Sequence, residues 1–381
     1  MSRDKNKLKR GHDPLNSLKN FRSWQAISAF CLAICLVVLA GCSSNSNNEG
    51  AASPSESSSA SASPSASQSA APSESAPAAG KTSYPLTIEN YTSSGDSGTW
   101  VKKNQTFEKA PERVVANTQP IAEMLIRLGL TDKMVGVAAL YGEMDPELKE
   151  EFEKIPVLSK DYVGKEPVVG ANPDLVMGRA DLFADADWGV GTVDSLNDLG
   201  INTFVHSTGV RGATLDSLYQ DISNIGQIFD IQDKAAEYVD ALKVRAEALK
   251  TKAAGLPEQK FAYVSDNGEG GINTYSGYVD TFQGDVLNLL GLTNAFADVE
   301  ESSISLEQLI AANPDVLLLS WYTGSPDAQT TLDKLYKNEQ LKDINAVKNK
   351  KVYVIDFNTY WGYGDQIVGG VEKLADEMTA Q

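Results

Sequence analysis

The sequence predicts an α/β protein: two doubly wound parallel-sheet lobes, a long helical segment that joins them, and a ligand cleft between the lobes. Three observations predict this fold. Residues 166–177 and 307–318 share five of twelve positions, including Asn-Pro-Asp. A shorter echo, Leu-Gly-Leu-Thr, occurs at 128–131 and again at 290–293. In both halves, strand-like apolar runs alternate with amphipathic helical patterns.

The two echoes predict the same local structures twice. In the longer echo an acidic residue opens a short helix, Asn-Pro ends it, and an apolar run suited to a buried parallel strand follows. In the shorter echo a glycine ends a helix in the left-handed conformation. Because the echoes are unequally spaced, we expect about twenty extra residues in the first lobe, within 139–162.

The elements follow the chain in a simple order. A leading hairpin is expected over 84–91 and 99–107, and two long helices without an intervening strand over 215–229 and 233–253. The other expected strands are 114–116, 134–137, 175–177, 203–205, 261–264, 316–319 and 352–355, and the other helices are 121–128, 192–199, 279–290, 306–312 and one from 366. This places the first lobe at 83–213, the bridge at 214–256 and the second lobe at 257–381.

The N-terminus has the pattern of a bacterial lipoprotein signal. Seven Lys or Arg residues lie within 1–24, and the apolar run 26–40, short for a membrane span, ends in Leu-Ala-Gly-Cys42. We therefore expect residues 1–41 to be a signal peptide and Cys42 to accept the lipid; an uncleaved anchor is the alternative. Cys42 would be the only cysteine left, so the folded part would have no disulfide. Residues 42–82, rich in Ser, Ala and Pro, read as a flexible tether.

The net charge limits the possible partners, and the predicted lipid anchor indicates the location. Losing residues 1–41 removes seven basic and two acidic residues, so the formal charge changes from -18 to -23. Nucleic acid and bare anionic lipid are then poor partners. A lipid anchor with a long tether predicts the extracytoplasmic face of the cell membrane, in a bacterium that lacks an outer membrane.

Several segments carry a family resemblance, which covers essentially all of residues 111–381. They are Pro-Glu-Arg-Val-Val-Ala at 111–116, Gly-Thr-Val-Asp-Ser-Leu at 191–196, and Glu166 and Glu307 with their Asn-Pro-Asp sequences. On these residues the chain resembles the substrate-binding lipoproteins of ABC importers, in the class with a helical backbone between lobes that serves iron-siderophores, haem and vitamin B12.

The resemblance implies a function and partners. It implies a monomeric binding protein that captures a ferric siderophore and delivers it to a permease dimer with its ATPase; haem or cobalamin is the alternative cargo. It also implies that Glu166 and Glu307 dock into Arg-lined pockets of the permease. Matched carboxylates on two lobes suit a two-fold partner, although each glutamate could instead merely favour a helix N-terminus.

The ligand should lie at the carboxyl ends of the strands, between the lobes. Aromatic residues at several strand ends predict a large, partly flat ligand, with core packing as the alternative for each. Arg179 points to an anionic group, or else forms a salt bridge with Asp181, Asp185 or Asp187. The predicted ligand-binding residues are Asn117, Thr118, Tyr141, Arg179, Trp188, Asn267, Trp321, Tyr322, Tyr360 and Trp361.

Enzymatic and metal-binding functions are disfavoured. His206 is the only histidine after the signal region, so a site for a bare metal ion is not expected, and no cofactor is predicted. His206 reads as a satisfied loop histidine, or as an axial ligand if the cargo were haem or cobalamin. A tethered hydrolase remains a remote alternative, because neither Gly-x-Ser-x-Gly nor His-Glu-x-x-His occurs.

Overall fold

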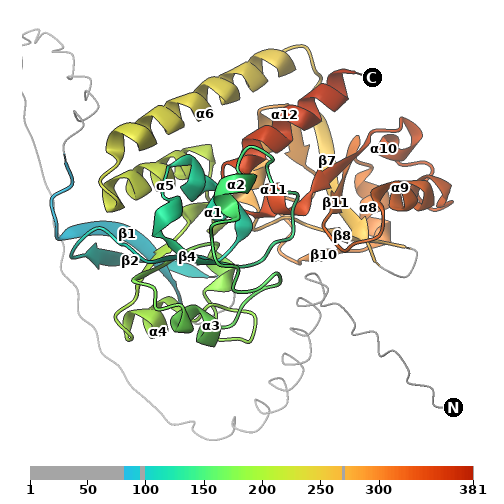
Figure 1. Cartoon of the computed structure of the whole chain (residues 1–381). Coiled ribbons are helices and arrows are strands. Elements are labelled where there is room, and N and C mark those ends of the chain that lie inside the picture. Colours follow the sequence, from blue (N-terminus) through green and yellow to red (C-terminus); the bar gives the residue numbers. More distant parts are fainter. Residues whose placement is uncertain (1–80, 95–98, 268–270, 381) are drawn as a thin grey trace, which may run out of the picture. The chain divides into compact units, whose positions relative to one another are not determined.

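A computed structural model describes residues 81–94, 99–267 and 271–380 (Figure 1). The first lobe is built on a parallel sheet of order β4-β3-β5-β6. Its strands are β3 Val114–Ala116, β4 Met134–Val137, β5 Leu175–Gly178 and β6 Asn202–Val205, and its helices are α1 Gln119–Arg127, α2 Lys149–Phe152, α3 Lys165–Gly170 and α4 Val193–Asn197, with short 3-10 turns at Thr131–Lys133, Ala180–Leu182 and Ser207–Gly209. The predicted extra residues lie between β4 and α3 and include α2.

The leading hairpin, β1 Leu86–Ser93 with β2 Trp100–Phe107, is antiparallel as predicted. It lies beside β6, and a buried amide joins the two. Asn90 Nδ2 donates to the Thr203 carbonyl at 3.0 Å, and the Val205 amide donates to Asn90 Oδ1 at 2.8 Å. The Asn90 side chain thus pairs with backbone groups at the open edge of β6, which would otherwise need a further strand as their hydrogen-bond partner.

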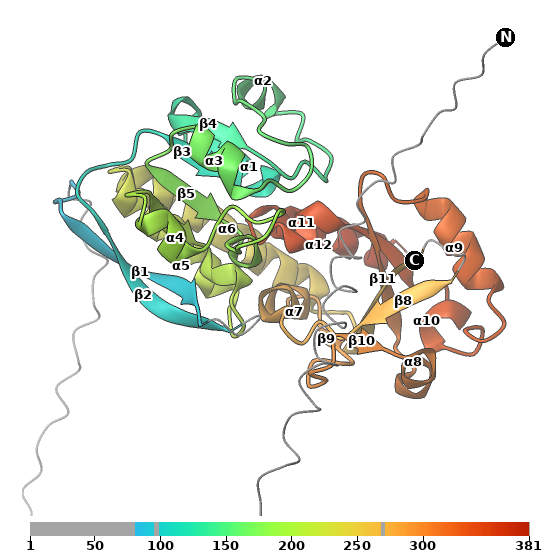
Figure 2. The ribbon, with the colours of Figure 1, turned by 90° about the horizontal axis from the view of Figure 1, so that it is seen from below.

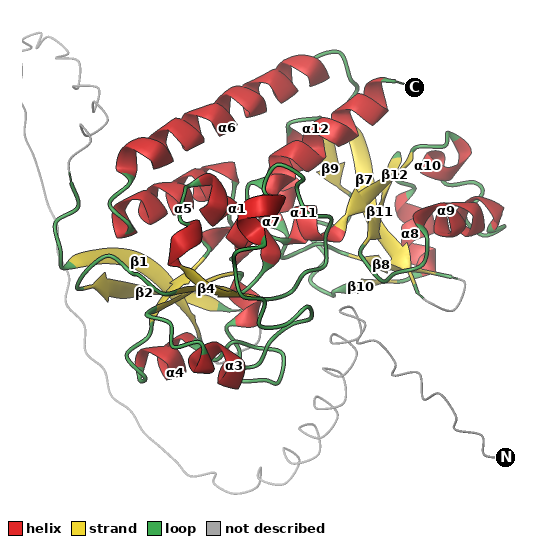
Figure 3. Ribbon diagram, in the orientation of Figure 1, coloured by secondary structure: helices red, strands yellow, loops and turns green. Residues whose placement is uncertain are grey.

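The bridge consists of the two predicted helices, α5 Leu215–Ile228 and α6 Gln232–Ala253 (Figure 3). α6 packs along α12 Gln366–Thr379, the closing helix of the second lobe. Arg245 donates two hydrogen bonds to Glu372, Nε to Oε1 at 2.9 Å and Nη2 to Oε2 at 2.7 Å. This two-point ion pair orients the bridge on the second lobe.

The second lobe repeats the first with additions. Its parallel strands follow the order β9-β7-β11-β12, which matches β4-β3-β5-β6. The sheet is extended by β8, which pairs antiparallel with β7, and by β10, which pairs antiparallel with β8 (Figure 2). The strands are β7 Gln259–Asp266, β8 Ile272–Tyr275, β9 Leu292–Asn294, β10 Ser303–Ile304, β11 Val316–Trp321 and β12 Val352–Asp356, and the helices are α7 Thr281–Asn288, α8 Leu306–Ala312, α9 Ala328–Lys337, α10 Asn345–Lys348 and α11 Phe357–Trp361. This sheet is therefore mixed, which the sequence reasoning did not anticipate.

The repeated sequences form equivalent turns. Asn172 and Asn313 both have left-handed backbones, with φ of 51° and 44°, and Gly129 and Gly291 have φ of 71° and 72°. In each copy, the aspartate after Asn-Pro accepts a hydrogen bond from a backbone amide at the start of a neighbouring strand, β3 in the first lobe and β7 in the second. Asp174 accepts from the Arg113 amide at 2.8 Å, and Asp315 accepts from the Lys260 amide at 3.1 Å. The double use of one module is thus present in both sequence and structure.

A common apolar core connects the lobes through the bridge. It includes Met177 of the first sheet, Ile222 and Leu242 of the bridge, and Leu318 and Ile367 of the second lobe. Opening the lobes widely would expose this core, so we expect the bridge to permit only modest motion.

The predicted signal peptide, Cys42 and all but the last two residues of the tether lie outside the described residues. Among the residues that the structure does describe, no helix is both long and apolar enough to span a membrane.

Candidate functional site

The carboxyl ends of the two sheets meet between the lobes. Thr323, after β11, donates its amide to the carbonyl of Tyr141, after β4, at 3.1 Å. Arg179, after β5, places its guanidinium 5.9 Å from the ring of Phe357, after β12. We call the set Tyr162, Arg179, Asp181, Asp280, Phe357 and Tyr363 the lobe junction.

The backbone of Arg179 is held by an amide from the neighbouring strand. Gly178 has a φ of 136°, and a side chain there would collide with Asn117 Oδ1. Buried Asn117 uses this space: its Oδ1 accepts from the Arg179 amide at 2.8 Å, and its Nδ2 donates to the Arg179 carbonyl at 2.9 Å. Asn117 therefore positions Arg179 rather than presenting its own amide to the junction.

The Arg179 side chain forms the salt bridge that the sequence analysis kept as an alternative. Nε and Nη2 donate to the two carboxylate oxygens of Asp181 at 2.5 and 2.7 Å, and Nη1 lies 3.4 Å from Tyr162 Oη. Burial is the largest single influence and lowers the pKa of Arg179, but Asp181, Tyr162 and Tyr363 together outweigh it and raise the pKa of the guanidinium. The cation is thus fully charged and already paired.

The second lobe supplies rings and a carboxyl group. Tyr363 stands 5.3 Å from the Arg179 guanidinium and donates from Oη to Asp280 Oδ1 at 3.2 Å. Burial raises the pKa of Asp280. The Tyr363 carbonyl accepts from Thr208 Oγ1 of the first lobe at 2.7 Å, so Tyr363 contacts the other lobe through both its backbone and its ring.

Behind Phe357 lies an aromatic cluster. Trp361 stacks on Phe357 with ring centroids 5.4 Å apart and meets Tyr263 and Tyr275 edge-on. Tyr360 is 1% exposed and belongs to the apolar core. Trp361, which is 5% exposed, belongs to the same core, so the core-packing alternative describes both residues, although Trp361 also supports the ring of Phe357.

The remaining predicted residues spread over several environments. Tyr141 is buried against Tyr162 at 5.1 Å, and half-buried Tyr322 contacts Phe357 at 6.4 Å. Thr118 is buried directly before α1, Trp188 is half-buried in a loop, and Trp321 is half-buried at the end of β11. Asn267, after β7, accepts a hydrogen bond from the Gly271 amide, before β8, at 2.8 Å. Their roles in ligand binding remain predictions.

Five of the six junction residues were not among the predicted ligand-binding residues, and of these five Asp181 was named only as a possible salt-bridge partner of Arg179. Phe357 directly follows the end of β12 and begins α11, a position that could have signalled it, whereas Asp280 directly precedes α7. Tyr162 falls in the extra segment of the first lobe, and Tyr363 follows α11 with a φ of 55°. Neither of these two tyrosines carries a sequence signal for its place, because each depends on the packing of two distant segments.

His206, which follows β6, is completely buried, and burial lowers its pKa to about 3. Its Nδ1 lies 4.0 Å from Oδ2 of Asp221 in α5, whose pKa burial raises to about 7. Across the described residues, no group of three or more His, Cys, Asp or Glu side chains is placed to hold a metal ion. His206 is therefore buried against Phe204 rather than presented at the junction, and neither ring nitrogen has a hydrogen-bond partner among the described residues, so the prediction of a satisfied loop histidine is wrong.

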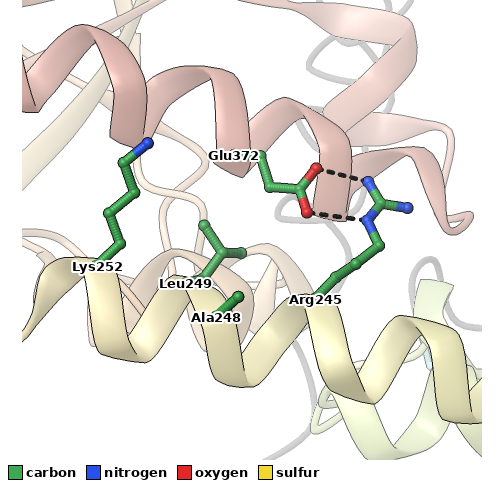
Figure 4. Close-up of a pocket in the computed structure, with 5 residues that line it drawn as sticks. All are labelled: Arg245, Ala248, Leu249, Lys252 and Glu372. Carbon is green, nitrogen blue, oxygen red and sulfur yellow. Dashed lines mark hydrogen bonds and ion pairs between the residues drawn. The ribbon is translucent and has the colours of Figure 1, made fainter.

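A separate small cavity of about 90 Å³ lies between α6 and α12 (Figure 4). It is lined by Arg245, Ala248, Leu249, Lys252 and Glu372. Pockets for organic ligands usually measure about 300 Å³ or more, so this cavity is too small for a chelate.

The two predicted docking residues occupy equivalent, exposed positions. Glu166 lies in the first turn of α3 and Glu307 in the first turn of α8. Within the described part of the chain, neither has an ion-pair partner. Both helices pack on the corresponding face of their sheets, through Val168 and Leu309. The two carboxylates thus form a repeated pair outside the junction set.

These features define a two-lobe binding-protein fold, and the comparisons with known proteins agree. The family model for periplasmic binding proteins matches residues 114–359, so the chain belongs to that family. This confirms the resemblance drawn from the sequence.

Relatives of known sequence and structure extend the match. YvrC, an uncharacterized ABC transporter substrate-binding lipoprotein of Bacillus subtilis, is 26% identical over 77% of this chain and 86% of its own. YfmC, an Fe(3+)-citrate-binding protein of the same species, is 26% identical over 88% and 90%. A solved structure of an ABC-type Fe3+-hydroxamate transport system from Saccharomonospora viridis is 26% identical, with a TM-score of 0.60 over 78% of this chain and 99% of that one.

Proposed function

We propose that the protein is an extracytoplasmic solute-binding lipoprotein that captures a ferric siderophore complex between its lobes and delivers it to an ABC importer. The observation that carries the proposal is the lobe junction, where a guanidinium from one lobe faces two aromatic rings from the other. Rings and a buried cation suit an organic chelate better than a bare metal ion.

The contacts of Arg179 with Phe357 and Tyr363 are those that a bound chelate would replace. They are non-covalent contacts between lobes at 5.9 and 5.3 Å, and each lobe keeps its own internal hydrogen bonds when they part. Binding can therefore exchange ring–cation contacts for ligand contacts without unfolding either lobe.

Two further parts of the proposal concern the membrane. Glu166 and Glu307, exposed at equivalent helix starts, would dock into basic pockets of the permease dimer, because paired carboxylates and guanidinium groups give oriented contacts. Cys42 would carry the lipid, a proposal supported by the lipoprotein description of YvrC.

The test is a titration of the purified protein, followed by tryptophan fluorescence, with ferric siderophores of several kinds, ferric citrate, haem and cobalamin. Trp361 stacks on Phe357, and Trp321 is paired with Asp356, which precedes Phe357, so both should report occupancy. We expect saturable quenching by a ferric siderophore. Saturation by haem or cobalamin alone would instead establish the alternative cargo, and a flat response to every compound would refute the binding role.

A further inference from the structure

The charge arrangement at the lobe junction restricts the cargo further. Resting on the function proposed above, we infer that the site selects ferric chelates of zero or positive net charge, as in hydroxamate chelates, and discriminates against anionic chelates through Asp181. In a hydroxamate complex the ligand groups balance the charge of Fe³⁺, whereas tricatecholate and citrate complexes retain negative charge.

The cation of the junction, Arg179, is already paired within its own lobe. Arg179 gives two of its donors to Asp181 at 2.5 and 2.7 Å and a third to Tyr162 at 3.4 Å. A guanidinium has five N–H donors in a fixed fork, so a bidentate carboxylate already occupies the face with which it would grip an anion. Arg179 and Asp181 together contribute no net charge.

The opposite lobe adds a further acid, Asp280, to the junction. Asp280 is buried beside Tyr363, and its pKa responds to both Arg179 and Asp181. When ionised, Asp280 makes the junction net negative; when protonated, it leaves the junction neutral. Neither state gives an anionic chelate a favourable field.

A second arginine does not reverse this balance. Arg211 is exposed, with its guanidinium 4.0 Å from the ring centroid of Tyr278, and Tyr278 Oη donates to Glu300 at 3.2 Å. Counting Arg211 with Glu300 again gives no excess of positive charge. The rings of Phe357 and Tyr363 favour a cation or a neutral organic surface.

The chain offers a matched pair of variants. Asp181→Asn keeps the shape of the side chain, removes its charge and frees Arg179 from its carboxylate. Asp185→Asn makes the same change in charge four residues away, at an exposed aspartate with no ion pair to Arg179 among the described contacts. Thermal unfolding of both variants checks that they fold.

The experiment measures the affinity of the wild type and of both variants for three chelates: uncharged ferrioxamine E, positively charged ferrioxamine B and multiply negative ferric enterobactin. We expect the wild type to bind the first two at least about tenfold more tightly than the third, the scale of one unfavourable charge contact in a partly solvated site. Asp181→Asn should improve ferric enterobactin binding about tenfold and change ferrioxamine E little, while Asp185→Asn should match the wild type.

Three outcomes overturn the inference while leaving the proposed function intact. The first is tightest binding of ferric enterobactin by the wild type. The second is an unchanged ratio of ferrioxamine E to ferric enterobactin affinity in Asp181→Asn, and the third is the same change of this ratio in Asp185→Asn as in Asp181→Asn. Absence of binding by all three chelates would instead refute the proposed function together with the inference.

Discussion

The buried pair of His206 and Asp221 predicts an unusual pH dependence of folding stability. The two side chains are 0% and 3% exposed, with Nδ1 and Oδ2 4.0 Å apart. Burial lowers the pKa of His206 to about 3 and raises that of Asp221 to about 7, while Ser207 and Thr208 donate hydrogen bonds to the carboxyl group. Between about pH 4 and 6.5 the folded pair therefore holds one proton, on Asp221.

The unfolded chain also holds one proton on this pair in that range, but on the histidine, because the ordinary pKa values are 3.8 for Asp and 6.5 for His. Since the folded and unfolded states bind the same number of protons on this pair, the pair does not make the unfolding free energy of the wild type depend on pH. Removing either partner breaks this balance, with opposite signs.

In Asp221→Asn only the unfolded state binds the histidine proton, so stability falls as pH decreases below 6.5, by about 1.4 kcal/mol per pH unit. In His206→Gln only the folded state binds the Asp221 proton, so stability falls as pH increases above about 4, by the same amount. Over one and a half pH units, the unfolding free energy of each variant should thus change by about 2 kcal/mol relative to the wild type, with opposite signs in the two variants.

Urea denaturation followed by circular dichroism, at steps between about pH 4.5 and 6, measures these slopes relative to the wild type. The comparison cancels the titration of all other groups, which the three proteins share. Slopes of the same sign in both variants, or slopes indistinguishable from the wild type, would show that the two groups do not carry the protonation states assigned here.

Three further predictions follow from anchoring, docking and the junction. Cys42→Ser should abolish labelling by a palmitate analogue in cells, and undiminished labelling would contradict the lipid anchor. Glu166→Lys with Glu307→Lys should leave chelate affinity of the purified protein intact while uptake of labelled cargo falls sharply, because each lysine repels a basic pocket; normal uptake would argue against docking, and lost affinity would place these residues at the ligand site. Asn117→Ala should lower the unfolding free energy by about 1–3 kcal/mol, since it leaves the Arg179 backbone groups unpaired, and urea denaturation would expose a smaller loss.

The repeated module was predictable because its chemistry is local. Asn before Pro can end a helix in the left-handed conformation, and the following Asp reaches the backbone of the adjacent strand in both lobes. The fold class followed from two such copies on either side of a helical bridge. The antiparallel strands β8 and β10 were missed because β8 follows directly on the strand end that the sequence analysis assigned to the ligand site through Asn267, and β10 is only two residues long.

The candidate site was less predictable. Arg179 and its local alternative partner Asp181 could be named, because they lie two residues apart. Tyr363, in contrast, reaches Arg179 from the other lobe, and no sequence pattern encodes a contact over that separation. Adjacent Tyr360 and Trp361 look equivalent in sequence and both pack into the core, yet Trp361 also stacks on Phe357, since successive helical residues point in different directions.

Hydrogen–deuterium exchange of the full chain, with and without a saturating ferric siderophore, tests the central claim most directly because it locates the ligand on both lobes at once. We predict slower amide exchange in residues 179–183 after β5 and in 357–363 after β12, with no change on the α6 surface at 245–252. Protection confined to one lobe, or found along α6 and α12 instead, would contradict capture of the chelate between the lobes.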